Sequence, residues 1–101
     1  MSHYKANLRD IEFNLFEVFG RGEVLGQGAY EDVDAETARE MLKEVARLSE
    51  NELAASFVAG DRTPPVFDPA TGSVTMPESF AKSFQAYVDS GFWNIDVPGE
   101  L

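Results

Sequence analysis

Apolar side chains recur with helical spacing along most of this chain, and their pattern predicts three helices. The first covers residues 10–19, carries six large apolar side chains in nine positions, and stops at Gly20. Asp10 is expected to cap it. At about 100° per residue, these side chains point in most directions around the helix. A helix this short does not hold itself together in water. We therefore expect this clip helix to be held by a surface outside the chain's own helices.

The second predicted helix spans residues 34–59, with Asp34 as its N-cap and Gly60 as its terminating glycine. One face carries the apolar residues Ala38, Met41, Leu42, Val45 and Leu48. The other face pairs acidic with basic residues three positions apart: Glu36–Arg39, Glu40–Lys43 and Glu44–Arg47. Because each carboxylate has a cation nearby, a solvated charged face is favoured over a metal site.

The third predicted helix spans residues 77–90, begins with Pro77 and ends at Gly91. Between the second and third helices, a cluster of turn-forming residues between short apolar runs indicates a small hairpin near residues 66–76. The predicted fold is thus all-α, a small bundle of about three helices with a possible short β-hairpin. The third helix should bury the stripe Phe80, Phe84, Tyr87 and Val88, and an extended segment should follow with Phe92, Trp93, Ile95 and Val97.

Charge and composition exclude several classes of partner. The 101 residues carry a formal charge of −10 and contain no cysteine. Binding to nucleic acid or to an anionic membrane needs clustered Lys and Arg, so neither is expected. No apolar run approaches the roughly 20 residues that span a bilayer, and no secretory signal is visible at the N-terminus. A cytoplasmic protein is expected.

Candidate chemistry is sparse. The glycine-rich stretch over residues 20–30 has Leu25 where the third glycine of a dinucleotide fingerprint would lie, and it follows a helix rather than a strand. The single histidine, His3, lies near the terminus, so no Ser–His–Asp or Cys–His unit can be assembled. No catalytic, cofactor-binding or metal-binding residue is predicted. The candidate interface residues are Tyr4, Arg9, Phe13, Phe16 and Phe19.

Several motifs together resemble the acyl-CoA dehydrogenases. The opening from Tyr4 to Val18 is similar to the N-terminal extension of long bacterial members, with Arg9-Asp10 before a phenylalanine-rich helix; Asn7 stands where proline is usual. Further matches to the family's N-terminal helical domain are Thr63-Pro64-Pro65-Val66-Phe67-Asp68, Val74-Thr75-Met76-Pro77 and Pro98-Gly99-Glu100-Leu101, the last being the start of a Pro-x-Glu-x-Gly-Gly loop.

The resemblance implies an N-terminal segment of a bacterial FAD-dependent acyl-CoA dehydrogenase. Residues 1–30 would be the N-terminal extension, and residues 31–101 would begin the α-helical domain, with the chain stopping before the β-domain. Such enzymes oxidise acyl-CoA thioesters and pass electrons through FAD to an electron-transfer flavoprotein. In this family the flavin contacts and the catalytic glutamate lie in later segments, so the resemblance implies that this segment alone binds no FAD and is inactive. Its partners would be the remainder of the enzyme or another copy, in a homo-oligomer.

A second hypothesis is a stand-alone acidic helical interaction module without catalysis. The charge of −10 and the aromatic clip helix support it equally well. Only the motif match separates the two hypotheses.

Overall fold

The computed structural model describes residues 3–95, 97 and 99–101, and these form a mainly helical chain with one two-stranded antiparallel sheet. The sequence predicted this fold class. The residues group into two compact units. The first unit is Lys5–Arg47, and the second combines the described residues of 1–4 with 48–101.

The first unit opens with the clip helix. Helix α1, Leu8–Glu12, continues directly into a π-helical turn, η1, at Phe13–Val18. The cap is Asn7 rather than the predicted Asp10, because the Asn7 Oδ1 atom accepts the Asp10 N–H at 3.1 Å. Asp10 lies instead in the first turn, where its carboxylate is favoured by the positive end of the helix.

The glycine-rich stretch that follows is shaped by its own backbone. Two short 3-10 turns, η2 at Arg21–Glu23 and η3 at Gly28–Tyr30, flank Gly26. The Gly26 N–H donates to the carbonyls of Tyr30 and Val33 at 2.9 and 2.8 Å. With φ at +81°, Gly26 has a left-handed conformation that a side chain would strain.

Helix α2, Ala35–Leu48, begins as predicted. The Asp34 carboxylate accepts the Thr37 N–H at 2.7 Å, and this hydrogen bond lowers the pKa of Asp34. Two predicted ion pairs form on the exposed face, Lys43–Glu40 at 2.9 Å and Arg47–Glu44 at 3.1 Å. The hydrogen bond from Lys43 to Glu40 raises the pKa of Lys43. On the opposite face, Leu48 is 4% exposed.

Beyond Leu48 the chain stays helical but changes its hydrogen-bonding pattern. A π-helical turn, η4 at Ser49–Leu53, is followed by a 3-10 turn, η5 at Ala54–Ser56, and then by α3 at Phe57–Arg62. The prediction that Gly60 ends this helix is wrong: Gly60 lies inside α3, and helix formation ends at Thr63, directly before two prolines that cannot continue it.

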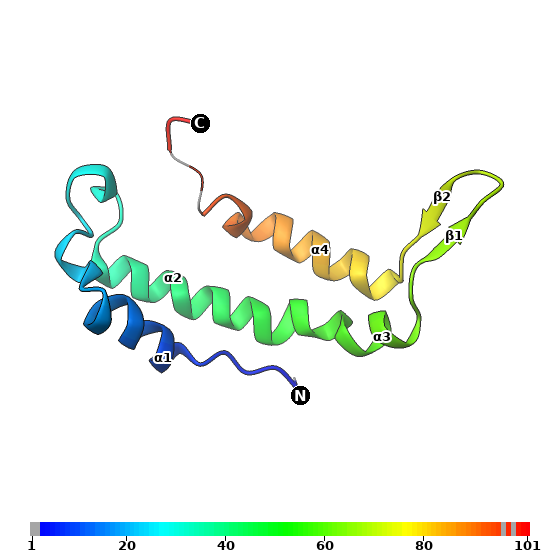
Figure 1. Ribbon diagram of the computed structural model, residues 1–101, viewed down its shortest axis with the longest axis horizontal. Helices are drawn as coiled ribbons and strands as arrows, with labels where there is room; N and C mark the ends of the chain where they lie inside the picture. Colours follow the sequence, from blue (N-terminus) through cyan, green and yellow to red (C-terminus); the bar gives the residue numbers. More distant parts are fainter. Residues whose placement is uncertain (1–2, 96, 98) are drawn as a thin grey trace. The chain divides into compact units, whose positions relative to one another are not determined.

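Helix α4, Glu78–Ser90, lies alongside η4 and η5 (Figure 1). It begins one residue later than predicted, because Pro77 has an extended ψ of 140° and occupies the N-cap position. Gly91 ends the helix as predicted, with φ at +77° and its N–H donating to Val88. The following residues form a 3-10 turn, η6 at Phe92–Asn94, rather than the extended segment expected from the sequence.

The packed face of α4 is not the predicted one. Ser83 is 6% exposed, and its hydroxyl donates to the Glu52 carbonyl at 2.7 Å. The face of α4 that carries small residues such as Ser83 therefore lies toward η4 and η5, and their small size permits a close approach of the backbones. The predicted buried stripe is exposed in this chain: Phe80, Phe84, Tyr87 and Val88. The periodicity identified an apolar face correctly, but the part of the chain that the structure describes does not cover it.

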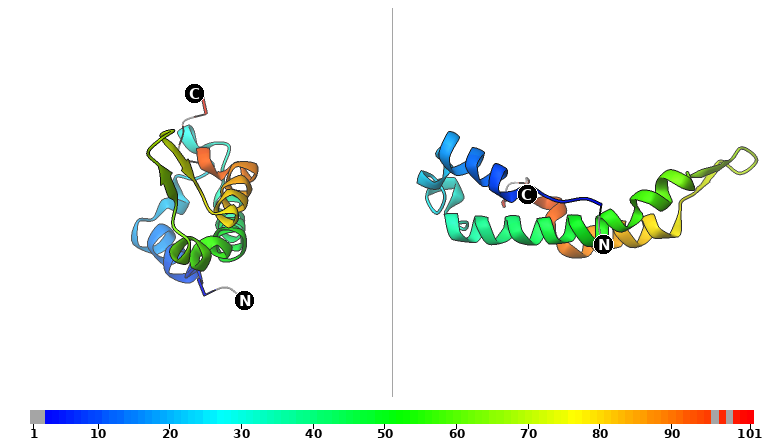
Figure 2. Two further views of the ribbon diagram at one scale, coloured as in Figure 1. Left: turned by 90° about the vertical axis from the view of Figure 1, so that its right-hand side faces the viewer. Right: turned by 90° about the horizontal axis from the view of Figure 1, so that it is seen from below.

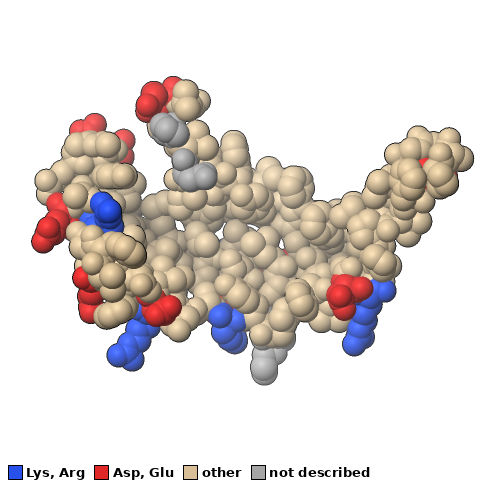
Figure 3. Space-filling view, viewed as in Figure 1, with Lys and Arg blue, Asp and Glu red and all other residues tan. Residues whose placement is uncertain are grey.

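The predicted hairpin extends from the end of the α3–α4 pair (Figures 1 and 2). Strands β1, Val66–Asp68, and β2, Ser73–Thr75, pair antiparallel, with Phe67 opposite Val74. Every residue of both strands is exposed. On the face drawn in Figure 3, the hairpin is almost free of charged side chains.

Candidate interaction surfaces

An open hollow in the first unit collects three of the five predicted interface residues. It has a volume of about 380 Å³ and lies between the clip helix and Arg39 of α2. Two arginines, two glutamates and two phenylalanines line it: Arg9, Glu12, Phe13, Phe16, Glu17 and Arg39. Opposite charges are mixed with aromatic rings here, so the hollow suits a partner surface that is apolar with polar edges.

Arg39 contacts an aromatic ring in this hollow. The central carbon of its guanidinium lies 3.9 Å from the centroid of the Phe16 ring, a cation–π contact. The predicted Glu36–Arg39 ion pair is therefore replaced by a contact with an aromatic ring. Arg39 is a residue that sequence reasoning missed, because a guanidinium with a glutamate three positions earlier looks like part of a solvated helix face.

The other predicted interface residues are less covered. Phe13 lines the hollow but is 49% exposed, and Phe19 is 63% exposed and lies outside it. Their exposure agrees with a clip helix that needs cover from elsewhere. That cover itself stays a prediction.

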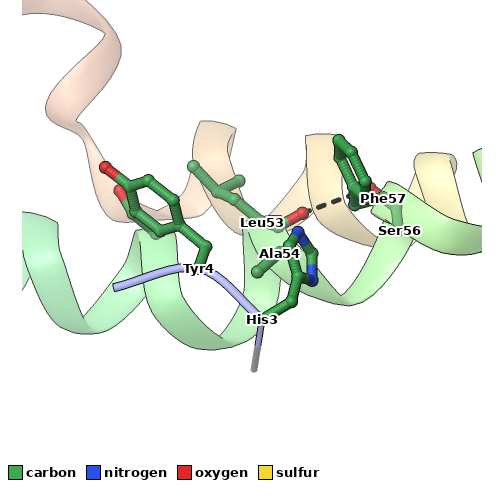
Figure 4. Close-up of a pocket in the computed structure, with 7 residues that line it drawn as sticks. His3, Tyr4, Leu53, Ala54, Ser56 and Phe57 are labelled. Carbon is green, nitrogen blue, oxygen red and sulfur yellow. Dashed lines mark hydrogen bonds between the residues drawn. The ribbon is translucent and has the colours of Figure 1, made fainter. Parts of the chain in front are cut away.

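Tyr4 lines a separate hollow in the second unit (Figure 4), of about 490 Å³. The N-terminal residues His3 and Tyr4 pass over the irregular helix there, and the His3 ring lies 4.4 Å from the Phe57 ring. The Ser56 hydroxyl donates to the Leu53 carbonyl at 3.2 Å, so this polar group is used within the helix. The floor is mainly apolar. Sequence reasoning did not name Leu53 and Phe57 as interface residues, yet both line this hollow.

The glycine-rich stretch uses the Gly26 backbone N–H within its own turn. A pyrophosphate cradle needs free backbone N–H groups, but the Gly26 N–H in the glycine-rich stretch is already taken by two carbonyls. Among the described residues no group of His, Cys, Asp and Glu is arranged to hold a metal ion. No described helix is both long and apolar enough to cross a membrane.

Comparison with known proteins shows what this chain is similar to. No protein-family model matches the chain. Over all 101 residues it is 56% identical to the broad-specificity linear acyl-CoA dehydrogenase FadE5 of Mycobacterium tuberculosis. Over 97 residues, 96% of the chain, it is 26% identical to the 3-methylmercaptopropionyl-CoA dehydrogenase of Ruegeria pomeroyi. The chain spans 16% of the length of each relative.

The match to the first relative runs through the clip helix, the glycine-rich stretch, the hairpin and α4 without leaving out any part of the chain. This bears out the resemblance that the sequence motifs indicated. The chain is homologous, over its full length, to the N-terminal part of an acyl-CoA dehydrogenase.

Proposed function

We propose that this chain is the N-terminal segment of an FAD-dependent acyl-CoA dehydrogenase that oxidises acyl-CoA thioesters to trans-2-enoyl-CoA in the cytoplasm. The observation that carries the proposal is the 56% identity over all 101 residues to an enzyme named for that activity. Acyl-CoA dehydrogenases are FAD enzymes. In the proposed reaction a hydride passes to the flavin, and the electrons then pass to an electron-transfer flavoprotein.

Within that enzyme, the proposed role of the segment is structural: it packs against the remainder of the enzyme or another copy in a homo-oligomer, and it helps to shape the substrate channel. Large apolar side chains support this role, since Phe19 and Phe57 are each 63% exposed. Burying a phenylalanine contributes about 1.5–3 kcal/mol. Exposed apolar side chains on an acidic chain favour burial against a protein partner over exposure to water.

The proposal is tested with two preparations. The intact polypeptide that contains this segment should convert acyl-CoA to enoyl-CoA, identified by mass spectrometry, when an electron acceptor is supplied. The 101-residue chain alone should neither quench flavin fluorescence nor oxidise acyl-CoA. Stoichiometric flavin binding by the isolated chain would contradict the structural role. An intact protein without acyl-CoA oxidation would contradict the enzymatic assignment.

The alternative, a stand-alone acidic interaction module, draws support from the same exposed apolar side chains and from the charge of −10. The genomic DNA after the codon for Leu101 discriminates between them. A reading frame that continues through a glycine pair and several further domains supports the enzyme. A stop codon at that point supports the module.

A further inference from the structure

The hairpin arm, residues 64–76, has one face built for contact. Successive side chains in a strand point to opposite faces, so the cross-strand partners Phe67 and Val74 share one face. They are 61% and 55% exposed. The other face carries Val66 opposite Thr75 and Asp68 opposite Ser73, so it is the more polar of the two. The arm therefore has an apolar face and a mixed face.

The turn of the arm is specified by its own residues. The Asp68 carboxylate accepts the Ala70 N–H at 2.9 Å, and the Asp68 carbonyl accepts the Gly72 N–H at 2.8 Å. The Thr71 and Ser73 hydroxyls lie 2.8 Å apart, and Gly72 has a left-handed φ of +73°. A two-stranded hairpin is marginal in water without a covering surface. The arm is shaped before docking, but its strands need an external cover.

Charge makes the arm unlike an ordinary exposed edge. Proteins protect free strand edges with charged side chains, especially lysine. In residues 64–76 the single charged residue is Asp68, and its carboxylate accepts a hydrogen bond within the turn. The remainder of the chain carries the net negative charge. An uncharged apolar face on an acidic chain fits an apolar protein surface. It offers no charged group with which an ionic partner could pair.

We propose that the Phe67–Val74 face of the arm docks onto an apolar surface in the remaining polypeptide of the same enzyme molecule. This inference rests on the proposed function. The chain spans only 16% of the length of its relatives, so an enzyme of their length would have ample polypeptide to supply the surface. Stable interfaces between separate molecules use about 20–30 residues a side. The arm is smaller than that. A covalently attached surface has an effective concentration in the millimolar range and needs less contact area to stay bound.

Thiol protection in the intact enzyme tests this placement. Phe67→Cys and Val74→Cys put a thiol on the docking face, and Val66→Cys is the matched control on the opposite face of the same strand. Each variant is labelled with a maleimide in native buffer and in urea, and the labelled peptide is followed by mass spectrometry. We expect both docking-face thiols to react at least about tenfold more slowly in the native enzyme than in urea, and the control thiol to change much less.

Each outcome decides a different point. Equal native and denatured rates at both positions 67 and 74 would overturn the docking face. Protection that disappears when the enzyme is diluted to monomers would overturn the intramolecular partner and assign the face to a second copy. Acyl-CoA oxidation is measured on the same samples. Protected thiols in a protein that binds no flavin and does not oxidise acyl-CoA would support the docking face and contradict the enzymatic assignment.

Discussion

The hydrogen bond from Ser83 to Glu52 holds α4 against the π-helical turn, and replacing Ser83 by alanine measures its contribution. The hydroxyl lies 2.7 Å from the Glu52 carbonyl on a side chain only 6% exposed. Removing the donor takes this partner from a part-buried carbonyl, which costs about 1–3 kcal/mol. Alanine returns a few tenths of a kcal/mol in helix propensity. The free energy of unfolding should therefore fall by about 0.5–2.5 kcal/mol.

Ser79 provides a matched control four residues earlier on α4. Its hydroxyl oxygen is buried and has no hydrogen-bond partner among the described residues. Ser79→Ala gains the same helix propensity and removes a buried polar atom that is not satisfied, so it should be neutral or stabilising. The assay is urea denaturation of the 101-residue chain at low concentration, followed by far-UV circular dichroism. Equal unfolding free energies for Ser83→Ala and Ser79→Ala would refute the role given to the Ser83 hydrogen bond.

Three further predictions concern the first unit. Asp34 has a lowered pKa in the folded chain, so its carboxylate stabilises the fold above the unfolded pKa of about 4, and this stabilisation is lost as pH falls through the folded pKa. In Asp34→Asn, the part of the acid-induced loss of helix that Asp34 causes should disappear, as followed by circular dichroism. Phe16 and Arg39 should show a coupling of about 0.5–1 kcal/mol in a double-mutant cycle with Phe16→Leu and Arg39→Gln, and additive effects would reject the cation–π contact. The isolated chain should self-associate in light scattering, and Phe13→Ser/Phe16→Ser should reduce this; a monodisperse wild-type chain that the double substitution leaves unchanged would reject the clip helix.

Local signals predicted the elements of this fold well. Asp34 caps α2 because its short carboxylate reaches the Thr37 N–H, and Gly91 ends α4 because it accepts a positive φ. The hairpin followed from turn chemistry between Val66 and Thr75. These features depend on a few neighbouring residues, so the sequence alone specifies them.

Packing direction was harder to predict. The aromatic stripe of α4, with Phe80 and Phe84, has the stronger periodicity, yet the smaller face around Ser83 packs within this chain. The π-helical turn at η4 also escaped prediction, because it changes which carbonyls are paired and leaves the apolar spacing unchanged. Arg39 was assigned to Glu36 because no local pattern reports a ring arriving from another helix. Residues distant in the sequence determine which helix face packs and which partner Arg39 contacts.

Anaerobic titration of the intact polypeptide with acyl-CoA tests the central claim most directly. If this chain is the N-terminal segment of an acyl-CoA dehydrogenase, the purified protein should show the absorbance of bound flavin. Added acyl-CoA should bleach that absorbance in proportion to the sites present, because each substrate transfers a hydride to FAD. A protein that contains this segment but carries no flavin, or whose flavin is not bleached by acyl-CoA of any chain length, would contradict the account.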